Sequence, residues 1–180
     1  MIDINYFVKN KNGAQNHPGI PVVNGEEDSS SAPKDLRIAE APLTVTFRGV
    51  VYPWHLDHMN HMNVQHYVGM FDQSSWVLLS MLGMDSEYFR DRRSGMAALE
   101  QSISYKCELR SGEMFEIRSG VREVSERTIR VQHNMHKVST GVLAASTTIL
   151  GVHIDVEARK SSPLPPGVLN RAEAIGALVR

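Results

Sequence analysis

LDHMNHMNVQHY, residues 56–67, is the stretch from which the fold of this chain can be derived. It places one carboxylate, three imidazoles and two asparagine side chains directly before the longest apolar segment, residues 64–82. Apolar side chains stand at the i, i+3, i+4 and i+7 positions of that segment and on most of its other sides, which predicts a helix buried inside a wrapping sheet. Asn63 is the predicted N-cap of this helix, and Gly83 follows it as a left-handed stop.

Composition bounds the class of protein. The 180 residues suffice for one domain with a real core, and a net charge of −1 gives no global field toward nucleic acid or an anionic membrane. A single cysteine, Cys107, excludes an internal disulfide framework. No apolar run approaches the roughly 18 residues that span a bilayer, and the first residues lack the apolar region of a signal peptide. We therefore expect a soluble, cytoplasmic protein that binds neither nucleic acid nor membrane.

Three segments differ in composition. Residues 1–41 have turn and linker compositions without sustained periodicity, so we expect a mobile N-terminal arm, in which residues 2–8 are compatible with a short strand. Residues 42–160 form the predicted domain. Residues 161–180 are expected to form a Ser/Pro-containing linker followed by a short helix that starts near Asn170.

Alternating apolar residues predict five strands around the helix. The first precedes the helix and the other four follow it almost without interruption, at residues 43–51, 99–109, 115–121, 129–135 and 142–154. The short turns between the last four predict an antiparallel meander. Such a sheet has two open edges, and pairing with a second copy is one way to cover an edge.

The motif Asp57, His61, Asn63 and Tyr67, set between a strand and an apolar helix, resembles that of hotdog-fold acyl-CoA thioesterases, in the 4-hydroxybenzoyl-CoA thioesterase-like branch. The resemblance covers residues 43–164. It implies an α+β hotdog fold, with an antiparallel five-stranded sheet wrapped around one long central helix, that assembles as a homodimer or homotetramer. The sequence departs from the motif at Asn60, which stands in the usual glycine position, and a common valine is replaced by methionine at position 62.

The resemblance implies an acyl-CoA thioester hydrolase that releases a free carboxylic acid and CoA. Asp57 is the expected general base or nucleophile, and backbone N–H groups near Val64, at the positive end of the helix dipole, are the expected oxyanion donors. His61 is a second expected catalytic residue that contacts the thioester, positions water or fixes Asp57; a structural turn residue is the alternative. Asn60 either holds the attacking water or serves a left-handed turn.

Other residues each have a functional and a structural interpretation. Asn63 and Tyr67 are expected substrate contacts, with a helix cap and a core position as the respective alternatives. Asp72, on the helix, faces either a partner subunit's pocket or solvent. Cys107 alternates with apolar residues and is expected in the core rather than as a nucleophile.

Histidines cluster around the motif, which raises the question of a metal. The four histidines are His55, His58, His61 and His66. Their spacings of three, three and five residues match no standard zinc motif, so we expect no metal and no bound cofactor. The chain also has no Gly-x-Ser-x-Gly elbow, which argues against an α/β-hydrolase esterase.

Two other functions share the predicted fold. One is a hydratase or dehydratase that acts on acyl-thioesters, and the other is a non-catalytic acyl-CoA-binding protein. The sequence leaves open the acyl chain, the choice between dimer and tetramer, and the choice between base and nucleophile for Asp57.

Overall fold

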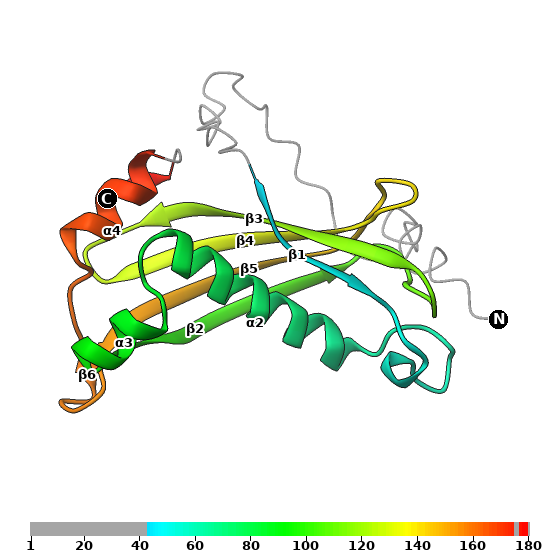
Figure 1. The fold of residues 1–180 in the computed structure, drawn as a ribbon, viewed down its shortest axis with the longest axis horizontal. Helices are drawn as coiled ribbons and strands as arrows, with labels where there is room; N and C mark the ends of the chain where they lie inside the picture. Colours follow the sequence, from blue (N-terminus) through cyan, green and yellow to red (C-terminus); the bar gives the residue numbers. More distant parts are fainter. Residues whose placement is uncertain (1–42, 175–176, 180) are drawn as a thin grey trace, which may run out of the picture. The chain divides into compact units, whose positions relative to one another are not determined.

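The computed structural model describes residues 43–174 and 177–179. The predicted mobile arm at residues 1–41, with its candidate strand at residues 2–8, lies outside the described residues. Figure 1 shows a curled sheet with one long helix, α2 (Val64–Met81), lying along one face. The expected architecture, an antiparallel five-stranded sheet wrapped around one central helix, is confirmed.

The sheet has five long strands in the order β1-β3-β4-β5-β2. All adjacent pairs among them are antiparallel. Their bounds are Thr44–Val50 for β1, Ser94–Tyr105 for β2, Met114–Val124 for β3, Thr128–Lys137 for β4 and Leu143–Asp155 for β5. Two short strands extend it, since β6 (Lys160–Ser161) pairs with β5 and β7 (Leu178–Val179) pairs in parallel with β3.

The predicted meander of four strands is wrong in one connection. Strands β3, β4 and β5 follow one another, but β2 pairs with β5 and forms the edge opposite β1. Residues 106–113 therefore cross the end of the sheet instead of making a tight hairpin. Strand β2 also begins at Ser94, five residues earlier than expected, directly after the helix α3 (Ser86–Arg92).

Helix α2 buries one face rather than its whole circumference, which corrects the expectation of a helix enclosed on all sides. The buried residues are Tyr67, Met70, Phe71, Ser74, Leu78 and Leu79. Large apolar side chains on its other faces are exposed, namely Val64, Val68, Trp76, Val77 and Met81. The predicted stop is confirmed, because Gly83 has a φ of +79°. This much exposed apolar surface on one helix is typical of interaction faces.

Two apolar clusters hold the helix to the sheet. The first surrounds the end of α2 and includes Leu78, Leu82 and Val168, the last from helix α4 (Pro166–Ala174). The second surrounds the start of α2 and includes Phe71 and Phe115. Helix α4 begins four residues before the position predicted for the C-terminal helix. Its apolar face packs against the first cluster.

A chain of buried polar side chains links three strands to the middle of α2. His133 on β4 has no exposed surface; its Nε2 lies 3.0 Å from Ser75 Oγ on α2, and its Nδ1 lies 2.6 Å from Ser119 Oγ on β3. Ser119 Oγ in turn lies 2.5 Å from Thr46 Oγ1 on β1. Burial lowers the pKa of His133 to about 4. The imidazole is thus neutral at pH 7 and acts as a structural link.

Within the part of the chain that the structure describes, no helix is long and apolar enough to cross a membrane. The cytoplasmic location stays a prediction.

The buried imidazole predicts a loss of stability in acid. An unfolded histidine has a pKa near 6.5, whereas that of His133 is about 4 in the folded protein, so the unfolded state binds more protons between these values. The free energy of unfolding should fall as the pH drops from 6.5 toward 4, by about 3 kcal/mol in total from this group. Urea denaturation at a series of pH values measures this loss.

The control is His58→Gln, which removes an exposed histidine and should leave the pH dependence unchanged. His133→Gln should flatten the dependence. An NMR titration of the native protein measures the pKa of His133 directly. A midpoint near 6.5 would contradict its assignment as a buried, neutral link.

Candidate active site

The segment between β1 and α2 forms a tight loop closed by backbone hydrogen bonds. After the short 3₁₀ helix η2 (Pro53–His55), Leu56 and Met62 form an antiparallel bridge. The Asp57 N–H donates to the His61 carbonyl at 3.0 Å, and the Asn60 N–H donates to the Asp57 carbonyl at 3.1 Å. Asn60 has a φ of 60°, so it occupies the left-handed position at which the family motif has glycine.

The loop is attached to the segment that leads from β2 to β3. The Met62 N–H donates to the Leu109 carbonyl at 2.7 Å, and both side chains are buried. The Asn63 N–H donates to the His55 carbonyl at 2.9 Å, which ties the start of α2 to the start of the loop. The loop that carries the motif is therefore held by main-chain bonds from two directions.

In the first turn of α2 the amides of Gln65 and His66 are bonded and that of Val64 is open. The Asn63 side chain accepts a hydrogen bond from the Gln65 N–H at 3.1 Å, which confirms the predicted N-cap. Among the described residues, the Val64 N–H has no hydrogen-bond partner, and Val64 is 57% exposed. A free amide at the positive end of a helix is a donor available to an anionic oxygen.

Asp57 points into the loop rather than into bulk water. Its side chain is 20% exposed, and Oδ1 accepts a hydrogen bond from the Met59 N–H at 2.8 Å. The same oxygen lies 3.8 Å from Nδ1 of His61. Within the described chain, Oδ2 accepts no hydrogen bond, so one carboxylate oxygen stays available.

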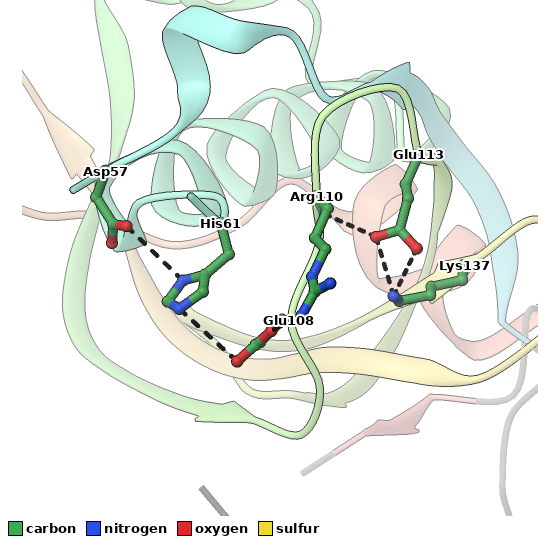
Figure 2. Close-up of polar contacts among 6 residues, drawn as sticks. All are labelled: Asp57, His61, Glu108, Arg110, Glu113 and Lys137. Atoms are coloured by element: carbon green, nitrogen blue, oxygen red, sulfur yellow. Dashed lines mark hydrogen bonds and ion pairs between the residues drawn. The ribbon is translucent and has the colours of Figure 1, made fainter. Parts of the chain in front are cut away.

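His61 lies between two carboxylates, as Figure 2 shows. Its Nδ1 faces Asp57, and its Nε2 lies 3.7 Å from Oε1 of Glu108. Both distances are ion-pair separations and too long for hydrogen bonds. Glu108 is bound on its other oxygen by Arg110 at 3.2 Å. Sequence analysis missed Glu108, because only the crossing of residues 106–113 brings it to this loop.

The same crossing segment carries a second ion pair, also drawn in Figure 2. Lys137 Nζ donates to the two carboxylate oxygens of Glu113 at 2.7 and 2.9 Å, and the Arg110 N–H donates to Glu113 at 2.7 Å. Burial alone would raise the pKa of Glu113, but these hydrogen bonds and charges outweigh it and lower the pKa. This pair stabilises the base of the segment that supports His61.

Tyr67, the fourth motif residue, lies in the core. It is 4% exposed and packs edge to face against Tyr105, with ring centroids 5.2 Å apart. Burial, followed by the nearby Cys107, raises the pKa of its phenol to about 12. The structure therefore gives Tyr67 a packing role in this chain, and Cys107 packs against the same cluster.

The histidines near the motif separate into different environments. His55 and His66 lie in ring contact at 4.7 Å, and burial together with the charge on His66 lowers the pKa of His55. His58 is exposed, and His61 faces the two carboxylates. In the described ranges, no three His, Cys, Asp or Glu side chains are placed to hold a metal ion.

A cavity of about 270 Å³ lies further along α2, against β2, β4 and β5. None of the six predicted catalytic and substrate-binding residues lines it. Asp72 does, in a position that is also exposed to solvent, together with Ser75 and Trp76. The sequence placed Asp72 on the helix surface, but the cavity depends on β2 lying at the far edge, which local patterns do not reveal.

Comparison with known proteins identifies the family. The family model described as the thioesterase-like superfamily matches residues 51–172. The chain is similar to the betainyl-CoA thioesterase of Pseudomonas aeruginosa, at 22% identity over 72% of this chain and 82% of that protein. It is also similar to the L-carnitine dehydrogenase/betainyl-CoA thioesterase of Rhizobium meliloti, at 24% identity over 82% of this chain but only 29% of that protein.

A solved structure supports the fold. A Staphylococcus aureus protein, determined in complex with CoA, has a TM-score of 0.70 and 19% identity to this chain, and covers 74% of this chain and 84% of its own. At this identity the likeness concerns the fold. The hotdog architecture expected from the sequence is confirmed.

The left-handed backbone at Asn60 predicts how this position responds to substitution. Asn60→Gly should leave the free energy of unfolding nearly unchanged, whereas Asn60→Val should lower it by about 1–2 kcal/mol, because a β-branched residue is strained at positive φ. Chemical denaturation measures both variants. If Asn60→Gly keeps full activity, Asn60 serves the turn; if it folds normally but loses activity, the side chain takes part in the reaction.

Proposed function

The chain belongs to the thioesterase-like superfamily, and from that premise we propose that it hydrolyses an acyl-CoA thioester to a free carboxylic acid and CoA. Family membership confirms the resemblance noted in the sequence and the expectation of a thioesterase. The observation that carries the proposal is that one short segment supplies both a largely buried carboxylate, Asp57, and an unbonded amide at the start of α2, Val64 N–H. Hydrolysis of a thioester needs both groups.

The carboxylate is assigned to the nucleophilic half of the reaction. Asp57 Oδ2 is available to take a proton from water, which then attacks the carbonyl carbon, or to attack that carbon itself. In the first path the C–S bond breaks and the acid is released directly. In the second, cleavage of the C–S bond leaves an anhydride between the acyl group and Asp57, which water then hydrolyses to release the acid and restore the carboxylate. In both paths the CoA thiolate leaves and is protonated. Met59 N–H holds the other oxygen, so the carboxylate is oriented before substrate binds.

The start of α2 is assigned to the oxyanion. As the tetrahedral intermediate forms, negative charge develops on the carbonyl oxygen, and the Val64 N–H with the helix dipole can stabilise it. The capped Gln65 amide is not available for this, because it already donates to the Asn63 side chain. Asn63 thus leaves the preceding amide as the open donor.

His61 is assigned a positioning role between Asp57 and Glu108. At 3.8 and 3.7 Å from the two carboxylates, the ring fixes the distance between them and lines the loop beside the reacting carboxylate.

The bifunctional and single-activity relatives both carry betainyl-CoA in their names. Betainyl-CoA is therefore the first substrate to assay, with simple acyl-CoAs beside it.

We further propose that the protein is a homo-oligomer that pairs through the edge strand β2. This strand has twelve residues, and its outer edge pairs with no strand in the described structure. Leu99 on it is 60% exposed, and apolar side chains of α2 are exposed as well. A long uncovered edge beside exposed apolar surface favours a second copy as its partner.

Asp57→Asn tests the catalytic assignment. Asparagine can still accept the Met59 N–H bond, so the loop should keep its shape, but the amide cannot act as a base or nucleophile. We expect kcat to fall by at least about 100-fold, the scale of losing a general base, while acyl-CoA binding persists. Thiol release from an acyl-CoA panel measures the rate, and calorimetry measures binding.

Asp91→Asn, an exposed carboxylate on α3, is the matched control and should keep wild-type activity. A near-normal rate from Asp57→Asn would reject the assignment. Enoyl-CoA hydration without thiol release would favour the hydratase, and tight binding without turnover in the wild type would favour a non-catalytic binding protein.

Leu99→Lys tests the proposed interface. The change places charges along the strand edge, and it should shift the assembly toward monomer or weaken association at least tenfold. Light scattering over a concentration series reads the oligomeric state. Val138→Lys, at another exposed apolar position outside β2, should leave the oligomeric state unchanged. A wild-type protein that is monomeric at high micromolar concentration contradicts the proposal.

A further inference from the structure

The cavity along α2 combines apolar walls with a single ionisable side chain. Its lining comes from α2, β2, β4 and β5, and Asp72 is the one lining residue, among those the structure describes, that carries a charge. A volume of about 270 Å³ lies at the small end of ligand pockets, which suits a compact group rather than a long acyl chain. The loop that carries Asp57 does not contribute to this lining.

Asp72 has no charge partner of its own. Within residues 43–174 and 177–179 it makes no ion pair and no hydrogen bond through its side chain, whereas Glu116 and Glu123 on β3 are each paired with arginine. An unpaired carboxylate at the edge of apolar walls gives the cavity a negative potential that favours a ligand cation over a neutral group. Asp72 itself is exposed, so solvent hydrates its charge in the absence of a ligand.

An aromatic ring stands one helical turn from this carboxylate. Trp76 follows Asp72 by four residues, so the two side chains lie on the same face of α2, and both line the cavity. Phe89 of α3 packs against the Trp76 ring edge to face, with centroids 5.6 Å apart, which orients the indole. A cation beside a tryptophan face gains electrostatic attraction to the ring.

The remaining polar lining narrows the kind of cation. Ser75 Oγ is already within hydrogen-bond distance of His133 Nε2 and of the Phe71 carbonyl, so it has little capacity for a ligand donor. Gln101 is the other polar side chain in the lining. A primary ammonium would bring three donors, for which Asp72 and Gln101 are the acceptors in this lining, and the rest of the wall is apolar. A quaternary ammonium brings no donor and presents methyl groups to those apolar walls, so it fits the whole lining better.

We propose that this cavity binds a quaternary ammonium group at the far end of the substrate's acyl chain, with Asp72 and Trp76 as the specificity-determining residues. This proposal rests on the thioesterase function proposed above. Asp72 follows Val64 by eight residues, about 12 Å along the helix axis. Within one chain an acyl group of roughly that length would connect the two; a shorter group requires the two elements to come from two copies.

Binding can be tested without turnover. In a Trp54→Phe background, Trp76 is the remaining tryptophan, and its fluorescence reports on the cavity. We expect choline to change this emission saturably and its neutral isostere 3,3-dimethylbutan-1-ol to bind at least about tenfold more weakly. Asp72→Asn should remove this preference. The titration is run at constant ionic strength, with choline raised to 100-fold above the protein concentration. Equal binding of the two probes overturns the inference. The absence of any fluorescence response to choline over this range also overturns it.

Turnover separates this inference from the proposed function. Betainyl-CoA and its neutral isostere 3,3-dimethylbutyryl-CoA are assayed as a pair, with a second pair whose acyl chain is longer by six methylene groups. We expect kcat/KM to favour the cationic member of at least one pair by about tenfold or more, and Asp72→Asn to reduce that ratio to within about threefold. Asp91→Asn should preserve the ratio.

The outcomes are distinguishable. Hydrolysis of the neutral thioesters with no preference for the cation overturns the cavity assignment but leaves the hydrolase intact. Equal losses on both members of a pair in Asp72→Asn also overturn it, because a residue that recognises the cation cannot affect the neutral isostere equally. If choline binds as expected but no thioester is cleaved, the cation site stands and the proposed hydrolase fails.

Discussion

The hydrogen bond from the Met62 N–H to the Leu109 carbonyl, 2.7 Å long, joins the two segments on which the candidate site depends. One segment is the loop that carries Asp57, and the other crosses the end of the sheet from β2 to β3. Because the bond lies between buried residues, it is protected from competition with water. It sets where α2 begins, and it brings Glu108 beside His61. A loop of this length without such an anchor would sample many conformations.

Helix α2 serves the structure and the chemistry with different faces. Its inner face packs against the sheet through Phe71 and Leu78, and the buried link from Ser75 to His133 fixes its rotation about its own axis. Its first amide stays unbonded, and its outer face presents Val68 and Trp76 to solvent. Rotating the helix to bury the outer face would leave His133 without a partner on α2, at the cost of an unsatisfied buried polar group.

Local patterns were sufficient for the parts of the structure that depend on neighbours in sequence. The N-cap at Asn63, the stop at Gly83 and the left-handed Asn60 follow from side-chain chemistry at single positions. The edge position of β2 does not, because strand pairing is decided by contacts between residues far apart in the sequence, as in the pairing of Ser104 with Ser146, 42 positions later. The position of Glu108 beside His61 and the cavity beside Asp72 both result from that pairing. Local sequence patterns therefore could not predict them.

The most direct measurement is a crystal structure with an acyl-CoA analogue in which a methylene group replaces the thioester sulfur. We expect the ketone oxygen to lie about 2.7–3.1 Å from the Val64 nitrogen. We also expect the ketone carbon to face the Asp57 carboxylate, either directly or through one water molecule. A bound analogue whose carbonyl lies away from the start of α2, with Asp57 still held in the loop by Met59, would contradict the proposed function.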